Sequence, residues 1–300
     1  MHWHPVTPHR FKLAEGPFWD AATHALYFTD IAGFQACRLT GQGLDRWQLT
    51  EPVSAFIPTE HGDALVTLAS GVYRLDLTSP TDHPRLRLFS QVDPVPGNRA
   101  NESRCDAQGR LWLSTMQNNL GPAGEDIPVT RDSGSLFRLT AGGDRGDPEV
   151  IQLLEGLGIP NTLEWSADGR YLYTADSRAG QLYRYPLHAN GDLGQREQWA
   201  VEGPGAPDGS ALDSEGYLWN ARWGGGCLLR FAPDGSLDRR IEVPVSHPTS
   251  CVFGGPDLST LYLTSAQPAS GATALDGGVF SAEVGVTGRP CHRFVEAYAK

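Results

Sequence analysis

The stretch Asp208-Gly-Ser-Ala-Leu-Asp-Ser-Glu-Gly-Tyr-Leu-Trp219 has a close counterpart in Asn101-Glu-Ser-Arg-Cys-Asp-Ala-Gln-Gly-Arg-Leu-Trp112. Each begins with a polar residue, reaches an Asp that opens a turn five residues later, and ends on an apolar pair of strand type. A polar residue stands ten or eleven positions ahead of such a pair at six places, namely Glu15, Ser54, Asn101, Asn161, Asp208 and Ser250. The six apolar pairs are therefore expected to mark one repeated structural unit.

The spacing of these pairs indicates the architecture. They begin at residues 26, 65, 111, 172, 218 and 261, which gives intervals of 39, 46, 61, 46 and 43 residues. Four-stranded propeller blades have periods of about 40–50 residues. The sequence therefore predicts an all-β fold, a six-bladed β-propeller formed by residues 1–300 as a single domain. A sandwich or a pair of barrels would leave the regular spacing unexplained.

Two further segments shape this prediction. The long third interval contains an insertion, residues 117–133, which we expect to form a loop over one mouth of the central channel. Ring closure is expected between Val6–Leu13 and the Val279–Val284 region.

Composition excludes several classes of function. A net charge of −11 argues against a nucleic-acid partner, because phosphates require a basic face. No apolar run reaches the length of about 18 residues that a membrane helix needs, and the first residues lack a secretory pattern. A cytoplasmic protein without membrane contact is therefore expected. The five cysteines form no C-x-x-C pair and are interpreted as buried thiols.

The innermost strand of each blade lines the channel of a propeller, so the polar residues at the heads of these strands should converge. Glu15 and Asp208 supply carboxylates there, and Asn101 and Asn161 supply carboxamides. Paired carboxylates repel each other unless a cation lies between them. Oxygen ligands favour Ca²⁺ first, then Mg²⁺ or Mn²⁺, with Zn²⁺ or Fe²⁺ less well matched.

Each of these residues also has a plainer interpretation. Taken singly, Asn101 and Asn161 are typical turn residues, and Asp208 lies in a Pro-Asp-Gly turn sequence. Arg99 precedes Asn101 by two residues and shares its side of the strand, but it could equally be a surface residue. Asp106, Asp168, Asp213 and Asp234 are interpreted as turn acids. Only the shared position of the converging residues in the repeat favours a common site over these separate interpretations.

Several motifs together resemble the regucalcin/gluconolactonase/luciferin-regenerating-enzyme family, over about Phe11 to Val284. They are Glu15-Gly-Pro-Phe-Trp19, Asn98-Arg-Ala-Asn101, Pro160-Asn161, Trp165-Ser-Ala-Asp-Gly169, Pro207-Asp-Gly209, Asp213-Ser-Glu-Gly-Tyr-Leu-Trp219 and Cys251-Val-Phe-Gly-Gly255. The resemblance implies a propeller with one divalent ion in its channel. Its ligands would be Glu15, Asn161 and Asp208.

The resemblance also implies roles in a reaction. Asp208 would be the acid/base residue, and Arg99 and Asn101 would contact the substrate. Asn119 falls where the family often has an acidic substrate contact, so the sugar preference is expected to differ.

The resulting hypothesis is a metal-dependent lactonase that opens a sugar lactone to the aldonic acid. The alternatives are a calcium-binding propeller without enzymatic activity and a hydrolase of the phosphotriesterase or arylesterase type. The sequence leaves the lactone, the ion and the oligomeric state open.

Overall fold

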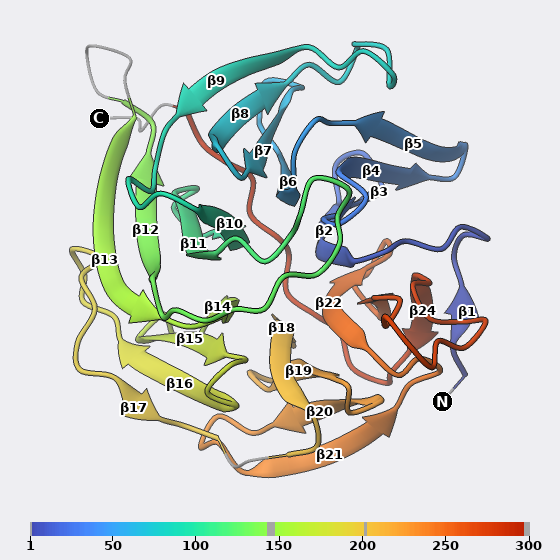
Figure 1. Ribbon diagram of the computed structural model, residues 1–300. Coiled ribbons are helices and arrows are strands. Elements are labelled where there is room, and N and C mark those ends of the chain that lie inside the picture. The colour runs from blue at the N-terminus through green and yellow to red at the C-terminus, as the bar shows by residue number, and fades with distance from the viewer. Residues whose placement is uncertain (1, 143–147, 201–202, 297–300) are drawn as a thin grey trace.

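The computed structural model describes residues 2–142, 148–200 and 203–296. Its strands form six antiparallel sheets of four strands each, arranged in a ring around a central axis (Figure 1). The predicted six-bladed β-propeller is thus confirmed. The described residues contain no helix, and hence none that is long and apolar enough to cross a membrane.

Each blade runs from an inner strand to an outer strand. The first three blades are β2–β5 (Ala14–Asp20, Ala25–Asp30, Gln35–Thr40, Gly43–Gln48), β6–β9 (Val53–Pro58, Ala64–Leu68, Gly71–Leu75, Leu86–Ser90) and β10–β13 (Asn98–Cys105, Leu111–Gln117, Gly134–Thr140, Glu149–Leu157). The others are β14–β17 (Pro160–Trp165, Tyr171–Asp176, Gln181–Pro186, Glu197–Gln198), β18–β21 (Ala206–Leu212, Leu218–Trp223, Cys227–Phe231, Leu237–Glu242) and β22–β24 (Pro248–Gly254, Thr260–Ser265, Phe280–Glu283) with β1 (His4–Pro5).

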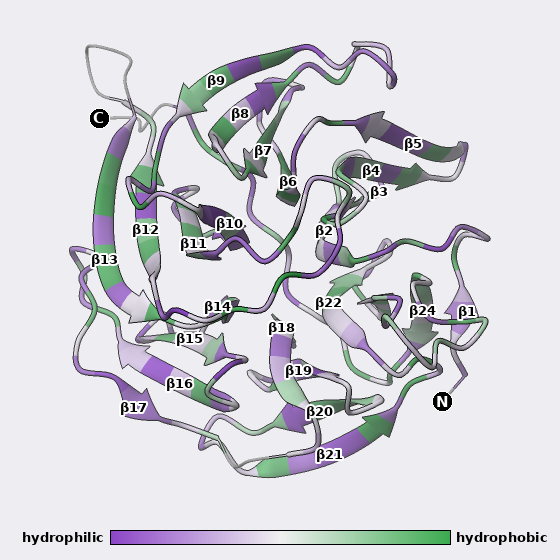
Figure 2. Ribbon diagram, in the orientation of Figure 1, coloured by the Kyte–Doolittle hydropathy of each residue, from purple (hydrophilic) through white to green (hydrophobic). Residues whose placement is uncertain are grey.

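The core lies between neighbouring blades. Hydrophobic and hydrophilic residues alternate along many strands, as the banding in Figure 2 shows. Trp219 of β19 is fully buried, and its ring meets Phe253 of the next blade edge to face at 5.8 Å. Trp112 meets Trp165 in the same way at 5.7 Å. These contacts pack one blade against the next and hold the inner strands in place.

Two of the expected turn acids do more than form turns. Asp106 and Asp213 accept backbone N–H groups within their turns, as predicted. Both are also buried, and each accepts the indole N–H of the tryptophan six residues later, Trp112 or Trp219. The interpretation as simple turn residues was incomplete, because these carboxylates also anchor the buried tryptophans.

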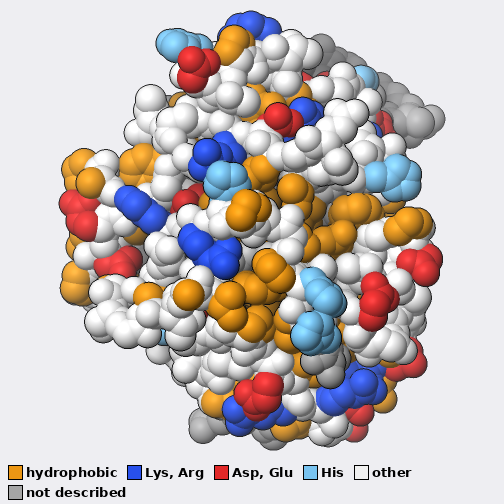
Figure 3. All heavy atoms as spheres, turned by 90° about the vertical axis from the view of Figure 1, so that its right-hand side faces the viewer, with side chains coloured by type: hydrophobic (Ala, Val, Ile, Leu, Met, Phe, Trp, Pro, Cys, Tyr) orange, Lys and Arg blue, Asp and Glu red, His pale blue; other side chains and the backbone are white. Residues whose placement is uncertain are grey.

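The ring closes between the two ends of the chain. β1 pairs with β24, so the first residues complete the last blade. Closure was expected to begin at Val6, and its N–H does bond to the Val279 carbonyl, but the strand itself lies just before it at His4–Pro5. On the side of the molecule near this junction, positive and negative side chains are interspersed (Figure 3).

One long segment crosses a face of the ring. Residues 118–133, called here the roof segment, connect β11 with β12 and reach over the centre to the first blade (Figure 1). Leu120 of this segment packs against Ile31 and Ala32, and Lys12 donates a hydrogen bond to the Ala123 carbonyl at 2.9 Å. The roof segment therefore stands over the ends of the inner strands that carry the polar heads.

Candidate functional site

Every inner strand is irregular at the polar position that the repeat predicts. The pairing register with the second strand shifts between Glu15 and Phe18, Val53 and Ala55, Ala100 and Ser103, Asn161 and Leu163, Pro207 and Ser210, and Pro248 and Ser250. A bulge leaves a residue unpaired and redirects its side chain. The bulge leaves Ser54, Asn101 and Asp208 outside the ladder, whereas Glu15, Asn161 and Ser250 are paired residues that border it.

The residues after two of the three predicted metal ligands have a left-handed backbone conformation. Gly16 follows Glu15 with φ +56°, and Thr162 follows Asn161 with φ +57°. A β-branched residue rarely adopts this left-handed conformation, and such strain is typical of functional sites. Thr162 is fully buried, and its hydroxyl donates to the backbone carbonyl of Asp208 at 2.5 Å. The strained residue thus ties two neighbouring inner strands together beside the predicted ligands.

A directed chain of hydrogen bonds joins the predicted amide residues. Arg99 donates from Nη1 to Asn101 Oδ1 at 2.8 Å, which leaves the Asn101 amide nitrogen to donate to Asn161 Oδ1 at 2.8 Å. Asn161 in turn donates to Ser177 Oγ, and Ser177 donates to the Pro207 carbonyl. This sequence of donors fixes the Asn161 side chain so that its oxygen faces Asn101 and the channel side.

Arg99 also reaches the start of the roof segment. Its Nε and Nη2 both donate to Asn119 Oδ1, at 3.0 and 2.8 Å. A further bond goes to its neighbour's backbone, the Ala100 carbonyl. Most of the guanidinium is therefore occupied by protein acceptors, so Arg99 holds Asn101 and Asn119 in position.

The two carboxylates lie together in a buried, negatively charged environment. Glu15 and Asp208 are 8% and 6% exposed. Burial, and then the nearby charge of Glu102, raise the pKa of Glu15 to about 8. Burial, followed by the charges of Glu15 and Glu102, raises the pKa of Asp208 well above its usual value. Arg99 and Arg104 only partly offset this repulsion at Glu15.

These residues fit a hard divalent cation. Carboxylate oxygens from Glu15 and Asp208 and an amide oxygen from Asn161 are the ligand types that Ca²⁺ and Mg²⁺ prefer. The described residues contain no group of three or more His, Cys, Asp or Glu side chains that could hold a metal. The amide would therefore have to complete the set of protein ligands. An ion there would stabilise the charged forms of carboxyl groups that burial otherwise favours as neutral.

Comparison with known proteins places the chain in a family. Residues 13–267 match the SMP-30/gluconolactonase/LRE-like region. The chain belongs to the SMP-30/gluconolactonase/LRE-like family. The resemblance inferred from the sequence motifs is thereby confirmed.

Individual members of the SMP-30/gluconolactonase/LRE-like family are similar over nearly the whole chain. A 6-deoxy-6-sulfogluconolactonase of Pseudomonas putida is 34% identical, with 92% of each chain covered. An L-arabinolactonase of Azospirillum brasilense is 32% identical over 95% of this chain and 93% of its own. The solved structure of a calcium-binding protein, regucalcin, from Agrobacterium tumefaciens aligns with a TM-score of 0.85 at 28% identity, covering 97% and 96% of the two chains.

Four residues beside the site were not predicted from the sequence. Glu102 adds a third buried carboxylate, Asn220 donates to the Asp208 carbonyl, and Thr162 and Ser177 make the bonds described above. Glu102 directly follows Asn101, and an ordinary alternating strand would have pointed it away. Glu102 and Thr162 lie at bulges, which leave no clear signal in a single sequence, and Ser177 and Asn220 lie outside the repeated polar positions, so only those positions could be found.

Proposed function

We propose that this lactonase opens an aldonolactone to the aldonic acid and uses one divalent cation held by Glu15, Asn161 and Asp208. The observation that supports this most is the buried Glu15–Asp208 pair beside the oriented chain from Arg99 to Asn161. The lactonase names of its relatives support the reaction class.

The residues of the site would have the following roles in the reaction. A bound divalent cation would supply Lewis-acid polarisation of the ester carbonyl. Asp208 accepts a proton from the attacking water and later returns one to the ring oxygen as it leaves. A raised pKa makes Asp208 a better base than an ordinary aspartate, although coordination to a cation would lower that pKa again. Asn101 and Asn119, held by Arg99, orient the hydroxyl groups of the sugar.

A metal-stripped preparation tests this proposal directly. The protein, treated with a chelator, is assayed by acid release from glucono-, xylono-, galactono- and arabinonolactone, with Ca²⁺, Mg²⁺, Mn²⁺, Zn²⁺ or Fe²⁺ added singly. We expect hydrolysis above the spontaneous rate only when an ion is restored. If ions bind tightly but no lactone is turned over faster than in buffer, the calcium-binding alternative is favoured over the enzyme.

A further inference from the structure

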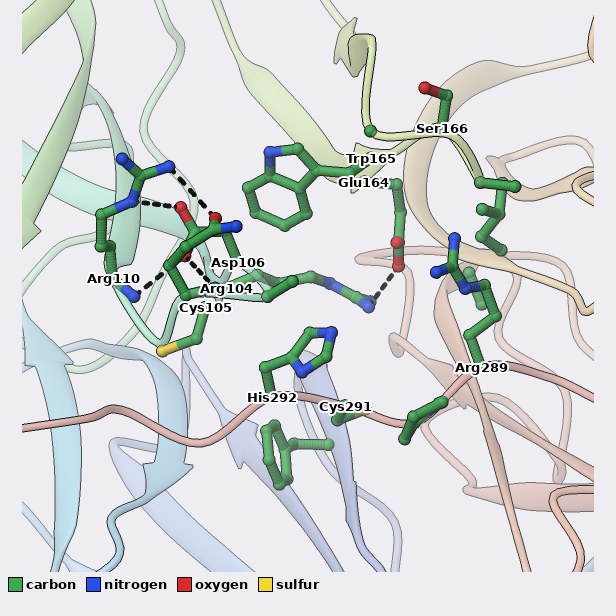
Figure 4. Close-up of a pocket in the computed structure, with 18 of the residues that line it drawn as sticks. Arg104, Cys105, Asp106, Arg110, Glu164, Trp165, Ser166, Arg289, Cys291 and His292 are labelled. Carbon is green, nitrogen blue, oxygen red and sulfur yellow. Dashed lines mark hydrogen bonds and ion pairs between the residues drawn. The ribbon is translucent and has the colours of Figure 1, made fainter. Parts of the chain in front are cut away.

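A cavity of about 510 Å³ lies at the end of the channel where the inner strands end, and Figure 4 shows part of its lining. The inner strands begin at the polar heads and end in turns, so residues at the strand ends mark this mouth. Phe18, Arg104, Trp165 and Phe253, all near the ends of inner strands, line it. Gly16 and Glu102, which follow Glu15 and Asn101 in the chain, line it as well, so the cavity extends from this mouth along the channel toward the residues beside the proposed metal site.

The end of the chain forms one wall of this cavity. Residues 285–296, called here the strap, cross the mouth and are fixed at several blades. Gly288 forms a bridge with Asp213, Arg293 pairs with Asp20 at 2.6 Å, and the Val295 N–H bonds to the Gly109 carbonyl. Arg289 and His292, which lie between these anchors, line the cavity. A ligand there would touch both the blades and the strap.

The acceptor groups that line the cavity are already engaged. Glu164 receives a hydrogen bond and ion pair from Arg104, which also donates to the Ser210 carbonyl. Asp106 accepts from the Arg110 guanidinium and the Trp112 indole. Glu102 also lines the cavity and lies 3.8 Å from Arg104 Nε, so the floor is an ion-pair cluster of Arg104 with Glu102 and Glu164. Figure 4 draws the Arg104–Glu164 pair.

Two side-chain donors of the strap, unlike Arg293, have no such partner among the described residues. The side chains of Arg289 and His292 make no hydrogen bond or ion pair with any other residue within 2–142, 148–200 or 203–296. Both are exposed at the rim of the cavity. The Trp165 indole stands across from them (Figure 4), and Phe18, Leu212 and Phe253 also line the cavity. The unpaired side chains at this mouth are therefore hydrogen-bond donors that lie beside apolar groups. Such a site suits a ligand that carries an anionic acceptor on an apolar body.

We propose that this cavity binds a small aromatic carboxylate or sulfonate, with its anion on Arg289 and its ring along Trp165. Guanidinium is suited to such anions because it can donate two parallel hydrogen bonds. The volume lies within the range of about 300–1,000 Å³ that small-molecule sites occupy. The anion of the ligand would bind at the rim, on Arg289, and the lining includes none of the proposed metal ligands.

The probe is 8-anilinonaphthalene-1-sulfonate, whose fluorescence rises in apolar sites, titrated against the full chain. We expect saturable binding that benzoate displaces and that a saturating sugar lactone or gluconate does not. Arg289→Glu should weaken binding about 10-fold or more, whereas Arg289→Lys should weaken it only several-fold. Lactone hydrolysis should be unchanged in both variants. Arg240→Glu, at an exposed arginine that pairs with Glu242 outside the cavity, is the matched control and should bind normally.

A second variant removes space without changing charge. Ala189→Trp, at an exposed lining residue, should also abolish binding, and circular dichroism melting shows whether each variant is folded. Equal affinity of wild type and a folded Arg289→Glu, displacement of the dye by lactone, or no saturable binding to the wild type would each overturn the proposal.

Discussion

At the scale of single residues, Asp208 combines burial with the adjacent charges of Glu15 and Glu102. Asp208→Asn removes the proton acceptor but keeps an oxygen that can face a cation. We expect kcat for lactone hydrolysis to fall by about 10²–10⁴-fold, the usual contribution of a general acid or base, while ion binding is partly retained. Initial rates of acid release and equilibrium dialysis measure the two effects. Asp234→Asn, at a fully exposed turn acid, is the control and should keep the wild-type rate.

Asn119 tests how the roof segment positions Arg99. Two donors of Arg99 converge on its side-chain oxygen. Asn119→Ala leaves these donors without that acceptor, and the loss of a hydrogen bond to a charged group should raise KM on the order of 10-fold, with a smaller effect on kcat. Asn119→Asp keeps the acceptor and should stay near the wild-type KM for at least one lactone. Michaelis–Menten curves that are alike for the two variants would contradict this role.

At the scale of elements, the repeat could be predicted from the sequence because each blade requires a buried second strand. The six apolar pairs that begin at Leu26, Leu65, Leu111, Leu172, Leu218 and Leu261 all lie in second strands, β3, β7, β11, β15, β19 and β23. The bulges were not readable, because they depend on pairing between strands and not on local composition. Thr162 illustrates the limit, since threonine gives no sign of a left-handed conformation. Similarly, Asp213 has an ordinary turn sequence, and its burial arises only when Arg230 and Trp219 pack around it.

The contact between the roof segment and the first blade can be tested by adding one methyl group at Gly124. Gly124 has φ +78°, and a Cβ there would lie 1.9 Å from the Ala32 carbonyl oxygen. Gly124→Ala should displace the roof from the first blade, loosen Asn119 and raise KM by about 10-fold, because small misplacements of positioning residues are costly. Gly156→Ala is the matched control, since Gly156 has φ +72° with no atom within 4 Å of the added carbon. Its KM should be unchanged, so an equal rise in both variants would assign the effect to backbone strain alone.

At the scale of the whole molecule, the buried carboxyl groups couple stability to pH and to the ion. In the absence of a cation, the pKa of Glu15 rises from an ordinary value near 4.5 to about 8, so the folded state holds a proton that the unfolded chain releases. The stabilisation is complete below the unfolded pKa and is lost as the pH rises through the folded pKa. The melting temperature of the chelated protein should therefore fall between about pH 5 and about pH 8.

A bound cation should reverse this dependence. It binds the native state, so it raises the melting temperature, and it competes with protons for Glu15 and Asp208, so the increase grows with pH. Glu15→Gln removes one titrating group and its repulsion of Asp208, and hence should flatten the pH dependence of the chelated protein and weaken its response to added ion. Differential scanning calorimetry with and without ion measures all four curves. If wild type and Glu15→Gln lose stability in parallel with rising pH, the titrating groups lie elsewhere and the Glu15–Asp208 pair does not form the cation site.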